Sequence, residues 1–210
     1  MFSTDILWKR NYERHVVIDI PDYVTDKLES AFISLKENDL LEKSDFTQAT
    51  ITKDLIDYKT FHALCNEILL LIQIDERICN FSKNHQVKLS LKNLYFLDYK
   101  KNQTDYPHTF RNLGHLTFSI CINTDESNRA YKSKQHSDTE VMLGNIKNRA
   151  YVADSNCMFK TQLIKNKLTV AVGILEFVKR DKPLSEKIYW LAHDLPKKLS
   201  IWDRVKKIWH

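Results

Sequence analysis

Two periodicities of apolar residues divide the chain. Before about residue 85 apolar side chains recur at helical spacing, whereas from residue 86 onward they alternate with polar ones, as in strands. The first part predicts helices over residues 24–36 and 59–82 and strands over residues 15–20 and 46–53. Helices early and strands late predict an α+β protein whose helices pack on a sheet.

The second half of the chain carries the clearer strand signal. A slip in the alternation within residues 87–99 predicts a β-bulge in that strand. Strands are predicted over residues 87–99, 116–123, 149–154, 156–159, 167–179 and 188–192. So many short strands in succession favour a barrel as the second half of the fold.

The composition gives no sign of several domains. A chain of 210 residues suits one hydrophobic core, and only 3 glycines and 4 prolines leave no segment typical of a linker. We therefore predict a single domain over residues 1–210. It comprises a mainly helical part (1–85), a β-rich barrel (86–195) and a basic amphipathic C-terminal helix (197–210).

The cysteines indicate a reducing compartment. Cys65 and Cys79 fall on a helical pattern, Cys121 and Cys157 fall on strand patterns, and none of them forms a C-x-x-C pair. We predict buried free thiols, which are typical of a cytoplasmic protein. Residues 1–10 are not followed by a signal-peptide core, which agrees with that location.

Several functional classes lack their sequence signatures. The chain has no P-loop, no Rossmann glycine pattern, no H-E-x-x-H and no C-x-x-C zinc spacing. Ser155 does not lie in a G-x-S-x-G elbow, and the segment 154–156 is predicted to be a turn. The net charge of +5 is mild, so nucleic acid is not an expected partner.

The C-terminal segment has two interpretations. In residues 198–210 Trp202 and Trp209 share the apolar face of the predicted helix, and Arg204, Lys206 and Lys207 lie off it. Such a helix either docks on the sheet or makes a peripheral contact with an anionic membrane surface.

One segment suggests a known family. Tyr106–Ser127 contains Pro107-His108-Thr109 followed by an alternating strand, and Arg149–Thr161 continues the pattern. These stretches resemble the core of the 2-oxoglutarate/Fe(II)-dependent oxygenases, in particular the prolyl-hydroxylase-like branch. The resemblance spans about residues 16–180 and implies a double-stranded β-helix, or jelly roll, with N-terminal helices on one sheet. It also implies Fe(II) and 2-oxoglutarate as cofactors.

The metal motif departs from that family. The resemblance implies a facial triad of two histidines and a carboxylate that holds Fe(II), with an arginine that binds 2-oxoglutarate. His108 stands at the position of the first histidine, but Phe110 occupies that of the carboxylate. After Phe159, where the second histidine belongs, the chain has Gln162–Lys165 instead. Arg180 is the nearest candidate for the arginine.

A second placement of the same motif lies further along the chain. His136 and Asp138 form an H-x-D pair, His193 follows at a suitable distance, and Arg204 would bind the 2-oxoglutarate carboxylate. The pair lies in a polar segment, residues 131–140, that is predicted to be a loop. His115, at the start of a strand, is either a further metal ligand or a structural histidine bonded to a neighbour.

Two hypotheses of function follow. In the first, the protein is a non-heme iron dioxygenase that hydroxylates a small molecule or a protein side chain, with His108 as the first ligand. In the second, the same barrel has lost its iron and serves as a binding or accessory protein. The substrate is open in both cases.

Overall fold

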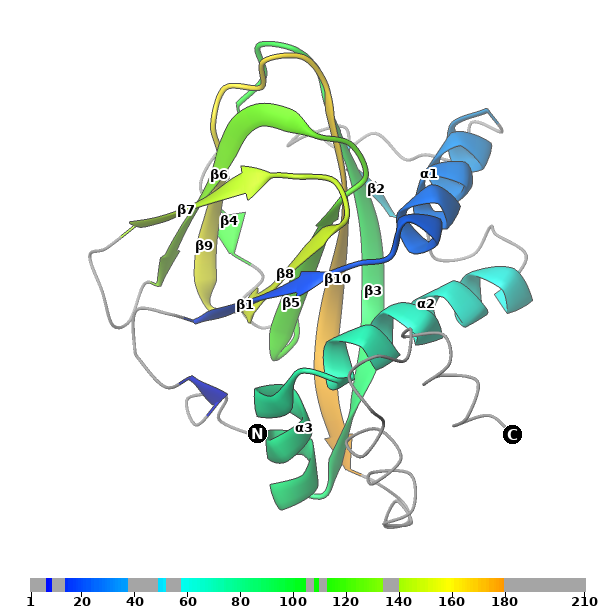
Figure 1. Cartoon of the computed structure of the whole chain (residues 1–210), viewed down its shortest axis with the longest axis vertical. Helices are drawn as coiled ribbons and strands as arrows, with labels where there is room; N and C mark the ends of the chain where they lie inside the picture. Colours follow the sequence, from blue (N-terminus) through cyan, green and yellow to red (C-terminus); the bar gives the residue numbers. More distant parts are fainter. Residues whose placement is uncertain are drawn as a thin grey trace.

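The computed structural model describes residues 7–8, 14–37, 49–51, 58–104, 108–109, 113–133 and 140–179. Within them the chain forms three layers: helices, a six-stranded sheet and a four-stranded sheet (Figure 1). The helices cover the outer face of the larger sheet, and the smaller sheet faces its other side. Two facing antiparallel sheets are the framework of a jelly roll.

The helical layer consists of three helices in the described part: α1 (Asp22–Glu37), α2 (Tyr58–Gln73) and α3 (Glu76–Asn84). The prediction of α1 is confirmed. The prediction of one helix over residues 59–82 is wrong, because the chain breaks after α2. The side chain of Asp75 accepts hydrogen bonds from the backbone N–H groups of Arg77 and Ile78 and so caps a new helix.

The six-stranded sheet is antiparallel, with the order β1-β8-β5-β10-β3-β2. Its register shifts between Ile174 and Leu175, which face Asn93 and Leu91, so Lys92 is an extra residue. This is the bulge that the alternation predicts. The strands are β1 (His15–Asp19), β2 (Ala49–Ile51), β3 (Val87–Tyr99), β5 (Leu116–Cys121), β8 (Arg149–Asp154) and β10 (Leu168–Lys179). Each overlaps a predicted strand.

The four-stranded sheet has the order β4-β9-β6-β7. Its strands are β4 (His108–Thr109), β6 (Asp125–Ser133), β7 (Glu140–Asn145) and β9 (Cys157–Thr161). The sequence does not predict β6 and β7. The two ends of the predicted loop over residues 131–140 belong to these strands, because β6 ends at Ser133 and β7 begins at Glu140. The polar sequence of β6 forms a strand because β7 and β9 pair with it on both sides, and pairing overrides weak local preference.

The core has two compartments, because the central strands are covered on both faces. Leu116, Phe118 and Ile120 of β5 join the cluster between the helices and the large sheet. Val170 and Val172 of β10 belong to a cluster on the opposite face of the sheet, inside the barrel. The prediction of free thiols is confirmed, because Cys65, Cys79, Cys121 and Cys157 are all free and buried.

Some predictions fall outside the described residues. The strand over 188–192 and the C-terminal helix over 197–210 belong to this group. In the described part of the chain, no helix has the length and apolar character needed to cross a bilayer.

Candidate functional site

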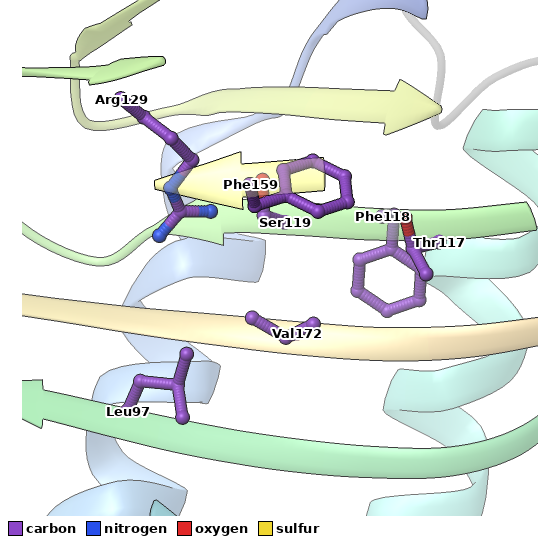
Figure 2. A pocket seen from close by; sticks show the side chains of 7 residues that line it. All are labelled: Leu97, Thr117, Phe118, Ser119, Arg129, Phe159 and Val172. Atoms are coloured by element: carbon purple, nitrogen blue, oxygen red, sulfur yellow. The ribbon is translucent and has the colours of Figure 1, made fainter. Parts of the chain in front are cut away.

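The barrel encloses a small cavity between its two sheets (Figure 2). The walls come from β3, β5 and β10 of the large sheet and from β6 and β9 of the small one. The cavity volume is about 10 Å³, which leaves room for about one water molecule. The lining residues are Leu97, Thr117, Phe118, Ser119, Arg129, Phe159 and Val172.

Arg129 supplies the charge in this lining. β6 pairs with both of its neighbours, so the Arg129 backbone is fixed opposite Leu143 and Thr161. The side chain is 4% exposed, and its Nε and Nη2 atoms have no hydrogen-bond partner among the described residues. Figure 2 shows it extending from β6 toward the side of the cavity where Ser119 and Val172 lie. Arginine is rarely buried without a partner, because a charge removed from water loses its hydration.

Two hydroxyl groups share the cavity with Arg129. Thr117 and Ser119 lie two positions apart on β5 and therefore project to the same face of the sheet. Both residues are buried, and in the described part of the chain neither hydroxyl oxygen has a hydrogen-bond partner. A hydroxyl group can donate one hydrogen bond and accept others. The cavity therefore brings together polar groups that form no hydrogen bond with any described residue.

The positive charge of Arg129 affects the pKa values of two neighbouring side chains, the Cys121 thiol and the Tyr151 phenol. Burial raises the pKa of the Cys121 thiol, and the Arg129 guanidinium opposes that rise. Burial also raises the pKa of Tyr151, with a further rise from Cys121, and Arg129 again acts in the opposite direction. Both groups are therefore neutral at neutral pH, and neither supplies a negative charge to Arg129.

His108, the first ligand that the family resemblance implies, lies on β4. The register places His108 opposite Phe159 of β9, which lines the cavity. β4 thus runs beside a strand that forms the cavity wall. The remaining predicted site residues, His136, Asp138, Arg180, His193 and Arg204, lie outside the described residues, as does Phe110, and their roles stay predictions.

His115 makes contacts that hold β5 against β10. Its ring Nδ1 accepts a hydrogen bond from the backbone N–H of Phe177 at 3.2 Å. The backbone N–H of His115 donates to the Leu175 carbonyl at 2.8 Å. Burial lowers the pKa of His115, although the charge of Glu176 opposes this. These contacts favour the structural interpretation of His115 over a role as a metal ligand.

Solved structures with this architecture exist. No protein-family model and no curated protein matches the sequence. A prolyl-4-hydroxylase from Pseudomonas putida superposes with a TM-score of 0.59 at 12% identity, covering 84% of this chain and 97% of that one. The α-ketoglutarate-dependent carbocyclase SnoK from nogalamycin biosynthesis gives 0.59 at 9% identity, covering 85% and 87%.

A viral collagen prolyl hydroxylase from Paramecium bursaria Chlorella virus-1, solved with 2-oxoglutarate, gives a TM-score of 0.55 at 12% identity. The match covers 78% of this chain and 96% of the viral one. The chain has the fold of the 2-oxoglutarate/Fe(II)-dependent oxygenases. The expected jelly roll with helices on one sheet is thereby confirmed. At such low identity the similarity shows the fold alone. The chemistry of the site has to be argued from the residues of this chain.

The described residues alone do not fit the iron centre of that family. Among them, no three His, Cys, Asp or Glu side chains lie close enough together to hold a metal ion. Phe159, a residue that cannot bind iron, stands opposite His108 in the β4–β9 register. A complete triad would have to draw ligands from residues beyond the described part.

Sequence reasoning missed Arg129, Thr117 and Ser119. The strand around Arg129 has no apolar alternation, so nothing in the local pattern indicates a residue that points into a barrel. Thr117 and Ser119 do alternate with Leu116, Phe118 and Ile120 on a predicted strand. The alternation shows that Thr117 and Ser119 share one polar face of the strand. From the sequence alone, such a face is expected to lie on the solvent side of a sheet rather than inside a barrel.

Proposed function

We propose that this protein is a 2-oxoglutarate/Fe(II)-dependent oxygenase-like protein that hydroxylates a small molecule or a protein side chain. The observation that supports the proposal is the barrel itself. Its strand order encloses a cavity between two antiparallel sheets, and solved structures with the same fold are prolyl hydroxylases and an α-ketoglutarate-dependent carbocyclase. Fe(II) and 2-oxoglutarate are the cofactors of the proposal.

His108 is the first metal ligand in this proposal. Its strand lies next to β9, and β9 contributes to the cavity wall. The further ligands would come from His136, Asp138 or His193, because His115 is already engaged with β10, and a carboxylate-binding arginine would be Arg180 or Arg204. A facial triad needs only three protein ligands, because 2-oxoglutarate and oxygen take the other positions.

The experiment is an anaerobic titration of the purified chain with Fe(II) and 2-oxoglutarate, followed by the visible metal-to-ligand charge-transfer band. We expect a band in the wild type and none in His108→Ala. His85→Ala is the matched control, because His85 lies at the C-terminal end of α3, outside the barrel. A band that is equal in all three proteins would remove His108 from the proposal.

One observation favours a second candidate function. Phe110 stands two residues after His108, where the family resemblance implies a carboxylate ligand, and phenylalanine cannot bind iron. The second candidate is a barrel that binds a small molecule or a protein without iron. No band and no bound metal after reconstitution would select this candidate and reject the oxygenase.

A further inference from the structure

Two loops lie against each other at one end of the barrel. The turn at residues 100–103 follows β3, and the loop at residues 162–167 connects β9 with β10. The backbone N–H of Asn102 donates to the Ile164 carbonyl at 2.9 Å, and the N–H of Ile164 donates to the Gln103 carbonyl at 2.9 Å. Figure 1 shows the connection from β9 to β10 arching beyond the strands. The two loops therefore form one continuous surface.

This surface carries lysines from three parts of the chain, and all of them are exposed. Neither residues 100–104 nor residues 162–167 contain an acidic side chain, and Leu163 is exposed among the lysines, at 45%. We use the name lysine surface for Leu163 together with Lys36 of α1, Lys100 and Lys101 of the turn, and Lys165 and Lys167 of the loop.

Two of these lysines share a single carboxylate. Lys36 and Lys167 pair with Asp98 at 3.5 and 3.7 Å, and their side chains are 55% and 56% exposed. The side chain of Asp98 is only 12% exposed, and it also accepts a hydrogen bond from the Thr169 hydroxyl at 3.1 Å. One negative charge thus lies beneath two positive ones, so this group presents a net positive charge to the solvent.

The other three lysines have no such partner among the described residues. No described carboxylate forms an ion pair with the side chain of Lys100, Lys101 or Lys165. Asp125 lies beneath the loop, but it is buried, and its carboxylate accepts hydrogen bonds from the backbone of the loop at Lys165 and Asn166.

The exposed acidic residues at the described borders of this region are Glu37 and Glu126. The lysine surface therefore sets five exposed positive charges against two negative ones. Charges of one sign gathered on adjoining loops create a potential that attracts a partner with many negative charges.

The residue types select the kind of anionic partner. Residues 100–104 and 162–167 contain no arginine and no aromatic residue. Arginine is the preferred residue for phosphates in nucleic acids, and aromatic side chains stack on unpaired bases. A nucleic acid would also leave Leu163 without an apolar partner. An anionic membrane suits both features, because lysines attract its headgroups and an apolar side chain enters the boundary between headgroups and acyl chains.

We propose that the lysine surface binds a membrane containing anionic phospholipids, with Leu163 inserted at the level of the headgroups. This role goes beyond the proposed hydroxylase function, because none of these six residues lines the barrel cavity. It also differs from the membrane contact that the sequence predicts for residues 198–210, since the lysine surface belongs to the barrel itself.

The test is co-sedimentation of the whole chain with vesicles of phosphatidylcholine, with and without phosphatidylserine. We expect binding only when phosphatidylserine is present. Raising the ionic strength from about 0.1 to 1 M shortens the Debye length from about 10 to 3 Å, so it should release most of the bound protein.

A triple variant tests the assigned lysines. Lys100→Gln/Lys101→Gln/Lys165→Gln should weaken binding to the anionic vesicles about 100-fold, since each lysine near an anionic surface contributes a factor of about five. The three side chains are exposed and form no ion pair with a described residue, so the variant should fold as the wild type does.

Matched controls remove the same groups elsewhere. Lys83→Gln/Lys88→Gln/Lys179→Gln takes three exposed lysines from α3 and from the opposite ends of β3 and β10, and it should bind nearly as the wild type does. Leu163→Ser should weaken binding about fivefold, because it removes the inserted apolar group. Leu113→Ser is its control, because Leu113 is 44% exposed at the opposite end of β5 and should have no effect.

Four outcomes would overturn the proposal. The first is no binding to vesicles with phosphatidylserine. The second is wild-type binding by the Lys100/Lys101/Lys165 variant, which would assign the contact to other residues, such as 198–210. The third is an equal loss in the two triple variants, which would mean that only the net charge matters. The fourth is binding to a DNA duplex, lost in the Lys100/Lys101/Lys165 variant, without binding to vesicles. None of these results depends on iron or on hydroxylase activity.

Discussion

Two arginines of this protein are almost equally buried and yet differ in their surroundings. Arg14 is 2% exposed and lies 3.1 Å from Asp154, which is fully buried and also accepts a hydrogen bond from the Trp8 indole. Arg129 is 4% exposed and shares its cavity with hydroxyl groups. The first arginine ties the start of the edge strand β1 to the end of β8. The second has its charge directed at an internal space.

The difference separates a structural ion pair from a buried arginine that lines a cavity. A buried pair is strongly destabilised when one partner is removed, because the other charge stays buried. A buried arginine without a carboxylate carries that penalty already. Substitutions at the two sites should therefore change stability in opposite directions.

The largest effect is expected at the paired site. Asp154→Ala leaves Arg14 without its counter-ion and should lower the free energy of unfolding by about 3–5 kcal/mol. Urea denaturation followed by far-UV circular dichroism measures it. Asp19→Ala is the control, because Asp19 is 93% exposed and 3.8 Å from Arg149, and it should change stability by less than about 0.5 kcal/mol. A loss below about 1 kcal/mol in Asp154→Ala would mean that the buried pair is not structural.

The opposite sign is expected at Arg129. Arg129→Met removes a buried charge that has no carboxylate partner among the described residues, so the protein should keep its stability or gain roughly 1 kcal/mol. The same urea experiment on Arg14→Met should show a loss of about 3–5 kcal/mol, because the Asp154 carboxylate then stays buried without the Arg14 cation. If both arginine variants lose similar stability, Arg129 has a structural partner and the comparison fails.

The sequence predicts the framework of this protein better than its interior. The strands β3, β5, β8 and β10 are clear in the sequence because these central strands are rich in apolar residues, and the bulge at Lys92 is visible as a slip in the alternation. The break between α2 and α3 escapes a periodicity argument, because Asp75 acts through one local cap in an otherwise helical pattern.

The candidate site was much less predictable. Arg129 occupies a polar strand that exists only because two neighbours pair with it, so its burial is a consequence of tertiary structure. The family resemblance pointed to His108 and its strand, and β4 does lie beside a cavity-lining strand. It also directed attention to arginines late in the chain, whereas the described barrel places an arginine on β6.

A smaller effect is expected when the Arg129 site is given a carboxylate. Ser119→Asp places an acidic group in the cavity that Arg129 lines, which makes the second site resemble the first. Relative to the wild type, the free energy of unfolding should rise by about 1 kcal/mol, since Arg129 gains the carboxylate partner that it lacks in the described part of the chain.

Ser119→Asn is the matched control for that variant, because it has the same size without the charge. It should show no gain in stability. A Ser119→Asp protein that is less stable than Ser119→Asn would show that Arg129 does not lie within reach of this position. Denaturation curves in urea compare the two variants.

The smallest effect concerns pH near the paired site, where the His115 carbonyl accepts a hydrogen bond from the Ser155 N–H. Burial lowers the pKa of His115 below its ordinary 6.5, against the opposing charge of Glu176. The unfolded chain therefore takes up a proton at a higher pH than the folded one does. The contribution of His115 to the free energy of unfolding is fully present above about pH 6.5. It falls as the pH drops toward the pKa of the folded state, by at most about 1.4 kcal/mol per pH unit for one proton.

His115→Gln should flatten that decline, because it removes the titrating group. Asp125 contributes in a separate window. Burial raises the pKa of Asp125, but hydrogen bonds from Ser127, Asn166 and Lys165 lower it by more, so the net pKa lies below the ordinary 3.8. The contribution of Asp125 to stability is therefore lost only as the pH falls below 3.8. Urea denaturation at a series of pH values between about 4 and 8, the range in which histidine titrates, reports on His115 without a contribution from Asp125. An unchanged slope in His115→Gln would assign the decline to another group and leave the Arg14–Asp154 region insensitive to this histidine.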